Sequence, residues 1–120
     1  MALDRDSKNT AYRLGRLFAA LEKTQQDAVP GANTTIKDRY YGSASATPRS
    51  VFPQLLRLAQ HHIQKAEYGR RTDKMIEEIV GEIKEFPAHL NLEDQGMFAI
   101  GYYHQRQAFY TKSENPKEGE

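Results

Sequence analysis

The chain has 120 residues, the length of one domain with a single core, and its 38% apolar and 28% charged residues are ordinary for a globular protein. It contains no apolar run long enough to span a bilayer and no charged-then-apolar leader, so the sequence predicts neither a membrane segment nor an export signal. The absence of cysteine excludes disulfides, thiolate zinc sites and cysteine nucleophiles, and it is compatible with the cytoplasmic location that we expect.

The net charge of +1 hides a division along the chain. Residues 1–71 carry twelve Lys/Arg and six Asp/Glu, whereas residues 72–120 carry five and ten. A basic half beside an acidic half indicates two different contact surfaces, the basic one suited to phosphates. Ordinary fluctuation of charge along a soluble chain is the alternative interpretation.

The first predicted helix covers AYRLGRLFAALEKTQQDA, residues 11–28, with Asn9 as its N-cap. Its apolar residues recur at i, i+3, i+4 and i+7, the spacing of one helical face, and they are Leu14, Leu17, Phe18 and Leu21. Pro30 and Gly31 end the helix. Nearly opposite the apolar face, the helical phase predicts an exposed cationic stripe that consists of Arg13, Arg16 and Lys23.

Two further elements follow in the basic half. A short helix is predicted over residues 35–41, and the Gly/Ser/Ala-rich stretch 42–46 is predicted to be a loop. Although Pro48 suits a first helical position, Pro53 also needs an early one, so we expect the regular third helix to begin near Ser50 and to end near Gly69. Its apolar stripe consists of Phe52, Leu55, Leu56, Ala59, Ile63 and Ala66.

The acidic half predicts two more helices. One begins at the cap Thr72 and ends at Pro87, and its glutamates favour a solvated face or a protein contact over nucleic acid. The other begins at Asn91, with Asp94 as a capping-box-like partner, and runs to about Lys112. This last helix is apolar nearly all round, which is typical of a central helix or of one packed against a partner. Its Gly101 is expected to permit a close helix crossing.

No segment shows the period-two alternation of a strand. The sequence therefore predicts an all-α protein, a compact bundle of four long helices plus one short helix. We expect residues 1–112 to form a single domain and residues 113–120 to be a polar, frayed tail.

The candidate nucleic-acid-binding residues are cations that the helical phase places away from the apolar faces. They are Arg13, Arg16, Lys23, Lys37, Arg39, Arg57, Arg70 and Arg71. A second set could stack on bases or contact another subunit, and it consists of Tyr40, Tyr41, Tyr103, Arg106 and Tyr110. For Tyr103, Arg106 and Tyr110, interior packing is a further alternative. A solvated face with scattered ion pairs is the plain alternative for the cations.

The histidines do not indicate catalysis or a metal site. His61 and His62 are adjacent, so a helix points them about 100° apart. His104 has no carboxylate at i+3 or i+4, and His89, with Glu93 at i+4, stands before the predicted helix start at Asn91 and not on a helix. The sequence also has no phosphate-binding glycine loop and no nucleophile elbow. We therefore expect no enzymatic activity, no cofactor and no metal.

Three segments together carry a family resemblance: NTAYRLGRLFAALEKTQQDA, the stretch from NTTIKDRYYGSASATP to VFPQLLRLAQHHIQK, and QGMFAIGYYHQRQ. Over residues 9–108 they resemble the C-terminal helical part of the large subunit of the type I-C CRISPR interference complex, Cascade. Met1 stands shortly before this region, which suggests the small subunit that such systems make from an internal start in the large-subunit gene. An excised domain is the competing explanation.

The resemblance implies a non-enzymatic, structural role. Small subunits of this kind are helical bundles that line the belly of the complex, beside the large subunit, the backbone subunits and further copies of themselves. They help to hold the crRNA–target DNA heteroduplex and to guide the displaced strand, while a recruited helicase–nuclease does the cleavage. Sequence recognition is left to base pairing, so the expected contacts are to phosphates. A protein–protein scaffold without DNA contact is the alternative.

Overall fold

In a computed structural model of the chain, the structure describes residues 3–29, 31, 35–65 and 70–113; for 61–65, 70–71 and 111–113 only the backbone is described. These ranges contain no strand and five helices: α1 (Thr10–Ala28), α2 (Ile36–Ala46), α3 (Pro48–Lys65), α4 (Arg70–Glu82) and α5 (Leu92–Ser113). The all-α fold, with four longer helices and one short one, is confirmed. None of the helices in these ranges has both the length and the apolar character needed to cross a membrane.

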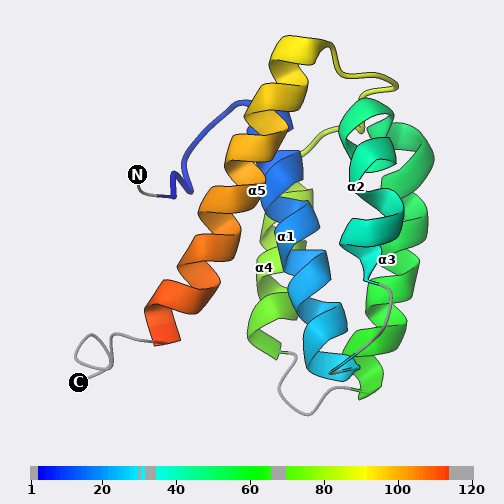
Figure 1. The fold of residues 1–120 in the computed structure, drawn as a ribbon, viewed down its shortest axis with the longest axis vertical. Helices are drawn as coiled ribbons and strands as arrows, with labels where there is room; N and C mark the ends of the chain where they lie inside the picture. The colour runs from blue at the N-terminus through cyan, green and yellow to red at the C-terminus, as the bar shows by residue number, and fades with distance from the viewer. Residues whose placement is uncertain (1–2, 30, 32–34, 66–69, 114–120) are drawn as a thin grey trace.

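Helix α1 is the central element, and the other four helices all pack against it (Figure 1). Its predicted apolar face is buried, and Phe18 lies at the middle of an aromatic cluster. The Phe18 ring meets the rings of Tyr41, Phe98 and Tyr102 edge-on, with centroids 5.6, 6.0 and 5.9 Å away. Because α1 is surrounded, polar side chains on its other faces lie inside the protein as well.

Glycines allow α1 and α5 to cross closely. A Cβ added to Gly101 would collide with the backbone carbonyl of Tyr12, and one added to Gly15 would collide with the carbonyl of Phe98. Only residues without a Cβ fit at these two points, which confirms the close crossing predicted at Gly101.

Side-chain caps fix three helix starts. The Asn9 Oδ1 accepts a hydrogen bond from the Tyr12 N–H at 2.9 Å, and the Asn91 Oδ1 accepts one from the Asp94 N–H at 2.8 Å. Both predicted N-caps are confirmed. Helix α2 begins with a full capping box between Thr35 and Asp38.

Helices α2 and α3 differ from the prediction. α2 continues through the stretch expected to be a loop and ends at Ala46, because Ala44 and Ser45 are buried and so fix that turn by packing. α3 begins at Pro48 rather than near Ser50, with Pro53 inside it. Proline suits the first position because it lacks an N–H. The predicted end at Gly69, the stripe residue Ala66 and the side chain of Ile63 lie outside the described residues.

Helix α4 also differs at both ends. It begins at Arg70, so Thr72 lies buried inside the helix and the prediction that it caps the helix is wrong. It ends at Glu82 rather than at Pro87, and residues 83–91 connect it to α5. The Arg49 N–H donates to the Pro87 carbonyl at 3.0 Å, and the Leu90 N–H donates to the Ala46 carbonyl at 3.0 Å, so this connection is bound to the junction of α2 and α3. The expected frayed tail, apart from the backbone of Ser113, lies outside the described residues.

Candidate nucleic-acid interface

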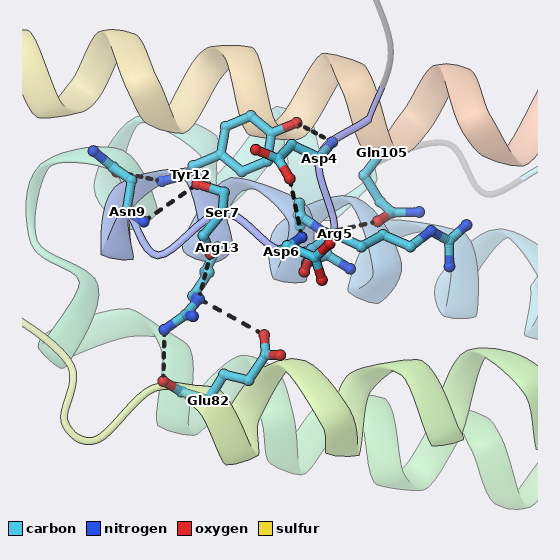
Figure 2. Close-up of polar contacts among 10 residues, drawn as sticks. Asp4, Arg5, Asp6, Ser7, Asn9, Tyr12, Arg13, Glu82 and Gln105 are labelled. Carbon is cyan, nitrogen blue, oxygen red and sulfur yellow. Dashed lines mark hydrogen bonds and ion pairs between the residues drawn. The ribbon is translucent and has the colours of Figure 1, made fainter.

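The first predicted cation, Arg13, ties three parts of the protein together (Figure 2). Its Nε donates to the Ser7 carbonyl at 2.8 Å, and its Nη1 donates to the Glu82 carbonyl at 2.9 Å. The Glu82 carboxylate lies 3.7 Å from the same guanidinium. Arg13 therefore joins the N-terminal segment to the C-terminal end of α4. A cation there also interacts favourably with the negative end of the helix dipole.

The second predicted cation, Arg16, is only 4% exposed, so the prediction that it lies on an exposed stripe is wrong. Its Nε donates to the Gln105 Oε1 at 3.0 Å, and its Nη1 makes a long contact of 3.5 Å with the Arg5 carbonyl. The physical reason is that α5 and the N-terminal segment cover this side of α1. Burial lowers the pKa of Arg16, an effect that the charge of Glu82 opposes.

The third cation of α1, Lys23, is half-buried and paired. Its Nζ lies 2.7 Å from the Asp27 Oδ1, an i, i+4 ion pair within the helix. All three cations predicted for the stripe on α1 therefore have partners inside the chain.

Cations on α2 and α3 are arranged differently. Arg39 and Arg57 are exposed, and neither forms an ion pair within the described part of the chain. Lys37 is half-buried, with its Nζ 5.5 and 5.8 Å from the ring centroids of Tyr102 and Tyr103. The side chains of the two remaining candidates, Arg70 and Arg71, lie outside the described residues.

Arg57 also borders a groove of about 610 Å³ between α3 and α4. Leu56, Ala59, Ile76 and Val80 contribute apolar walls, while Asp73 and Glu77 place carboxylates on the α4 side. The surface around Arg57 is therefore mixed in charge, although neither carboxylate is paired with Arg57.

The tyrosines that follow Arg39 belong mostly to the core. Tyr41 is half-buried, and its ring meets those of Phe18, Phe98 and Tyr102 at centroid distances of 5.6, 5.5 and 5.2 Å. Burial raises the pKa of the Tyr41 phenol. Tyr40 also packs partly against the core. Interior packing, which the sequence did not predict for this position, accounts for Tyr41.

The aromatic stretch of α5 has two faces. Tyr102 points inward, fully buried, and its hydroxyl donates to the Glu22 Oε1 at 2.7 Å. On the outer face, Tyr103 is 52% exposed and Tyr110 is 44% exposed. The Arg106 guanidinium lies 6.0 Å from the Tyr110 ring centroid, and the Tyr110 hydroxyl donates to the Gln26 Oε1 at 2.9 Å.

Of the histidines, His104 has a defined structural contact. Its Nδ1 lies 2.7 Å from the Tyr12 hydroxyl, which also accepts a hydrogen bond from the Asp4 N–H at 2.9 Å (Figure 2). His89 is exposed, and the side chains of His61 and His62 lie outside the described residues. The side chains that the structure describes contain no group of three or more His, Asp or Glu arranged to hold a metal.

Sequence reasoning missed two residues with structural roles. Gln105 is buried beside Arg16, and its Nε2 has no hydrogen-bond partner among the described residues. Arg49 donates from its Nε to the Phe86 carbonyl at 3.1 Å and lies 3.5 Å from the Glu85 carboxylate. No local pattern reveals either contact, because the partners are 89, 37 and 36 positions apart in the chain.

Comparison with known families decides the class of protein. The sequence matches the family model described as CRISPR-associated protein (Cas_Csd1) over residues 1–110. The chain belongs to the Csd1 family. A search of curated proteins gave no match. The Csd1 family is that of the large subunit of type I-C Cascade, so the resemblance found in the sequence is confirmed at the level of the family and of the complex.

Within this Csd1-family chain, the predicted cations fall into two groups. Arg13 and Arg16 make contacts inside the protein, while Arg39 and Arg57 are exposed without ion pairs in the described residues. Contact of any of them with nucleic acid stays a prediction. The exposed group is where a phosphate would find a cation that is not already hydrogen-bonded to the protein.

Proposed function

We propose that this chain is a non-catalytic structural subunit of type I-C Cascade that acts as its small subunit. It lines the belly of the complex beside the large subunit, the backbone subunits and further copies of itself. There it contacts the backbones of the crRNA–target DNA heteroduplex and of the displaced strand, and so stabilises the R-loop. The observation that carries this proposal is the family match over residues 1–110.

The exposed cations of α2 and α3 support the nucleic-acid part of the proposal. Phosphate contacts need guanidinium or ammonium groups at the surface, and Arg39 and Arg57 meet this requirement. Because the strands of an R-loop vary in sequence, contacts to the backbone suit such a subunit better than contacts to base edges. Arg13 and Arg16 suit this role less well, since a phosphate would have to compete with their internal hydrogen bonds.

The proposal is tested by binding of target DNA to the reconstituted complex, with and without this chain, across a salt series. If the chain supplies phosphate contacts, its omission weakens R-loop binding and flattens the dependence of log K on log salt. Complexes that bind with the same affinity and slope in both cases would favour a protein scaffold without DNA contact.

Variants then locate the residues that bind phosphate. Arg39→Gln together with Arg57→Gln should reduce the salt slope by about one for each phosphate that the variant no longer neutralises. The matched control is Lys74→Gln together with Lys84→Gln, which changes the net charge by the same amount at two exposed positions near the glutamates of α4. The assignment to α2 and α3 is wrong if both double variants lower the affinity and the slope equally.

A further inference from the structure

The N-terminal segment, residues 3–9, covers one side of α1 without packing deeply against it. It contains neither helix nor strand, and none of its residues is buried. Figure 2 shows the stretch from Asp4 to Ser7 lying along α1, between α5 and α4. A segment held by a few hydrogen bonds, and not by buried apolar contacts, opens at a low cost in free energy.

Three side chains of α1 hold this segment, each through a backbone group: Tyr12, Arg13 and Arg16. The Tyr12 hydroxyl accepts a hydrogen bond from the Asp4 N–H at 2.9 Å. The two arginines donate to carbonyl groups of the segment, Arg13 at 2.8 Å and Arg16 at a long 3.5 Å. Both arginines therefore hold the segment through neutral acceptors, and the contact of Arg16 is the weaker one.

The side chains beneath the segment lack an anionic acceptor. Arg16 is buried, yet no carboxylate in the described part of the chain lies within ion-pair distance of it. Its Nε donates to the neutral Gln105 Oε1, and the Gln105 Nε2 is a buried donor without a partner among the described residues. Burial lowers the pKa of Arg16; the charge of Glu82 opposes this effect, and two neighbouring arginines add to it. Positive charge and an unused N–H are thus buried together.

A phosphate oxygen is the acceptor that this arrangement lacks. Hydrogen bonds from a guanidinium to a phosphate are charge-assisted and about twice as strong as bonds between neutral groups. A phosphate in place of the Arg5 carbonyl would meet Arg16 and the free N–H of Gln105, with Arg13 one helical turn away. The Glu82 carboxylate lies 3.7 Å from Arg13 and competes for that guanidinium, so Arg16 is the principal cation.

We propose that Arg16, Gln105 and Arg13 form a phosphate-binding site that the N-terminal segment covers, and that a phosphate enters by displacing this segment. The carboxylates of Asp4 and Asp6 belong to the segment and move away with it. The site adds to the exposed cations of α2 and α3 a second set, whose apparent affinity depends on the fraction of open molecules. It rests on the proposed function only in naming a nucleic-acid backbone as one source of phosphate; inorganic phosphate is the other.

The first experiment loosens the segment in the isolated full-length chain. Asp4→Pro removes the N–H that donates to Tyr12 and leaves the three residues of the site unchanged. Asp4→Ala is the matched control: both variants lose the carboxylate and its bond to the Asp6 N–H, but only Asp4→Pro loses its own N–H. By fluorescence anisotropy, Asp4→Pro should bind a labelled oligothymidine of about 20 nucleotides two- to tenfold more tightly than Asp4→Ala, roughly the weight of one neutral hydrogen bond.

The second experiment fills the site. Gln105→Glu keeps the acceptor for the Arg16 Nε, removes the unpartnered N–H and places a carboxylate where the phosphate would bind. It should therefore fold, as urea denaturation checks, and should weaken oligothymidine binding about tenfold and abolish the gain from Asp4→Pro. Gln107→Glu is the matched control, because it makes the same change of charge at an exposed position of the same helix and should have a much smaller effect.

Hydrogen exchange shows in the parent chain whether the segment moves. The amides of Asp4 and Ser7 are both hydrogen-bonded in the covered state. Oligothymidine, or inorganic phosphate at constant ionic strength, should make them exchange faster, and Gln105→Glu should remove this response. A response to both probes supports a site for the free anion, and a response to oligothymidine alone supports one that takes phosphate from a nucleic-acid backbone.

Three outcomes overturn the proposal. They are equal affinities of Asp4→Pro and Asp4→Ala, equal weakening by Gln105→Glu and Gln107→Glu, and exchange at residues 4–7 that neither probe changes. All three are measured on the isolated chain, whereas the proposed function is tested by the salt series with the whole complex. Failure of one is therefore distinguishable from failure of the other.

Discussion

Helices α1 and α5 present opposite mismatches between sequence and environment. α1 carries polar and charged residues on the side opposite its apolar face, yet it is buried on nearly every side. α5 is apolar nearly all round, yet one long side of it is exposed. The two helices cross closely at Gly15 and Gly101, so both mismatches occur in one helix pair.

The difference shows how the two kinds of mismatch are resolved. In α1 the buried polar groups find partners within the chain: Arg16 with Gln105, and Glu22 with Tyr102. In α5 the exposed apolar groups are covered only in part: Tyr103 lies beside Lys37 of α2 and Tyr110 is hydrogen-bonded to Gln26 of α1, while Leu92 is 84% exposed. A buried polar face can be satisfied internally, whereas an exposed apolar face is satisfied only by a partner.

The largest expected effect comes from separating the two helices. Gly101→Ala places a methyl group against the backbone carbonyl of Tyr12, where no flexible side chain can move aside. We expect the free energy of unfolding to fall by at least about 3 kcal/mol in urea denaturation. Gly42→Ala is the control, because its Cβ meets nothing within 4 Å, and it should stabilise α2 by up to about 1 kcal/mol. Equal effects would show that α1 and α5 do not cross as closely as described.

The next effect tests whether the polar side of α1 is internal. Arg16→Met leaves the buried Gln105 amide without its donor, so it should lower the free energy of unfolding by about 1–3 kcal/mol. Arg39→Met, at an exposed arginine, should change the free energy of unfolding by no more than about 0.5 kcal/mol. Adding Gln105→Leu to Arg16→Met should recover part of the loss, since both unsatisfied groups are then removed. If Arg16→Met leaves the free energy of unfolding unchanged, the Arg16 guanidinium lies in solvent and not between the helices.

Local signals in the sequence predicted much of the fold. Asn9 and Asn91 cap their helices as expected, because a cap depends on residues only three positions apart. The apolar face of α1 is buried and α5 crosses it at Gly101. The start of α4 was missed, since Thr72 resembles a cap in sequence but is buried within the helix.

The candidate site could be predicted less well, for a physical reason. Helical phase gives the direction of an apolar face but not the number of neighbours, so it predicts that the side opposite Leu14 faces solvent. Arg16 is buried through a contact with Gln105, 89 positions away, that no spacing rule encodes. By the same limit, an apolar helix could not be assigned to the centre or to an interface, and the structure places α1, not α5, at the centre (Figure 1).

The pH dependence of the free energy of unfolding tests the buried hydrogen bond between Tyr102 of α5 and Glu22 of α1. Burial and the hydrogen bond to Glu22 raise the pKa of Tyr102 well above the usual value of about 10. The folded state therefore keeps the phenol proton that the unfolded state loses above pH 10, so stability is full below pH 10 and falls as the pH rises. For one such group the loss is at most about 1.4 kcal/mol per pH unit.

Tyr102→Phe removes this contribution and should make the decline of unfolding free energy between pH 10 and 11 less steep. Urea denaturation at pH 9, 10 and 11 measures this decline. For Tyr103→Phe, on the exposed side, the free energy of unfolding should fall with pH as it does for the parent. At neutral pH, Tyr102→Phe is itself destabilising because the buried Glu22 carboxylate loses its donor. Parallel declines for Tyr102→Phe and the parent would mean that this phenol titrates normally.

The smallest expected effect tests the exposed side of α5 within a single copy. Leu92→Ala should change the free energy of unfolding by less than about 0.5 kcal/mol in dilute solution, because Leu92 is 84% exposed. Leu55→Ala, at a buried leucine of α3, should lower it by about 2–5 kcal/mol. A loss above about 1 kcal/mol for Leu92→Ala in the monomer would mean that Leu92 is covered within its own chain. If the loss appears only at concentrations where copies associate, the apolar side of α5 stabilises the assembly rather than the fold.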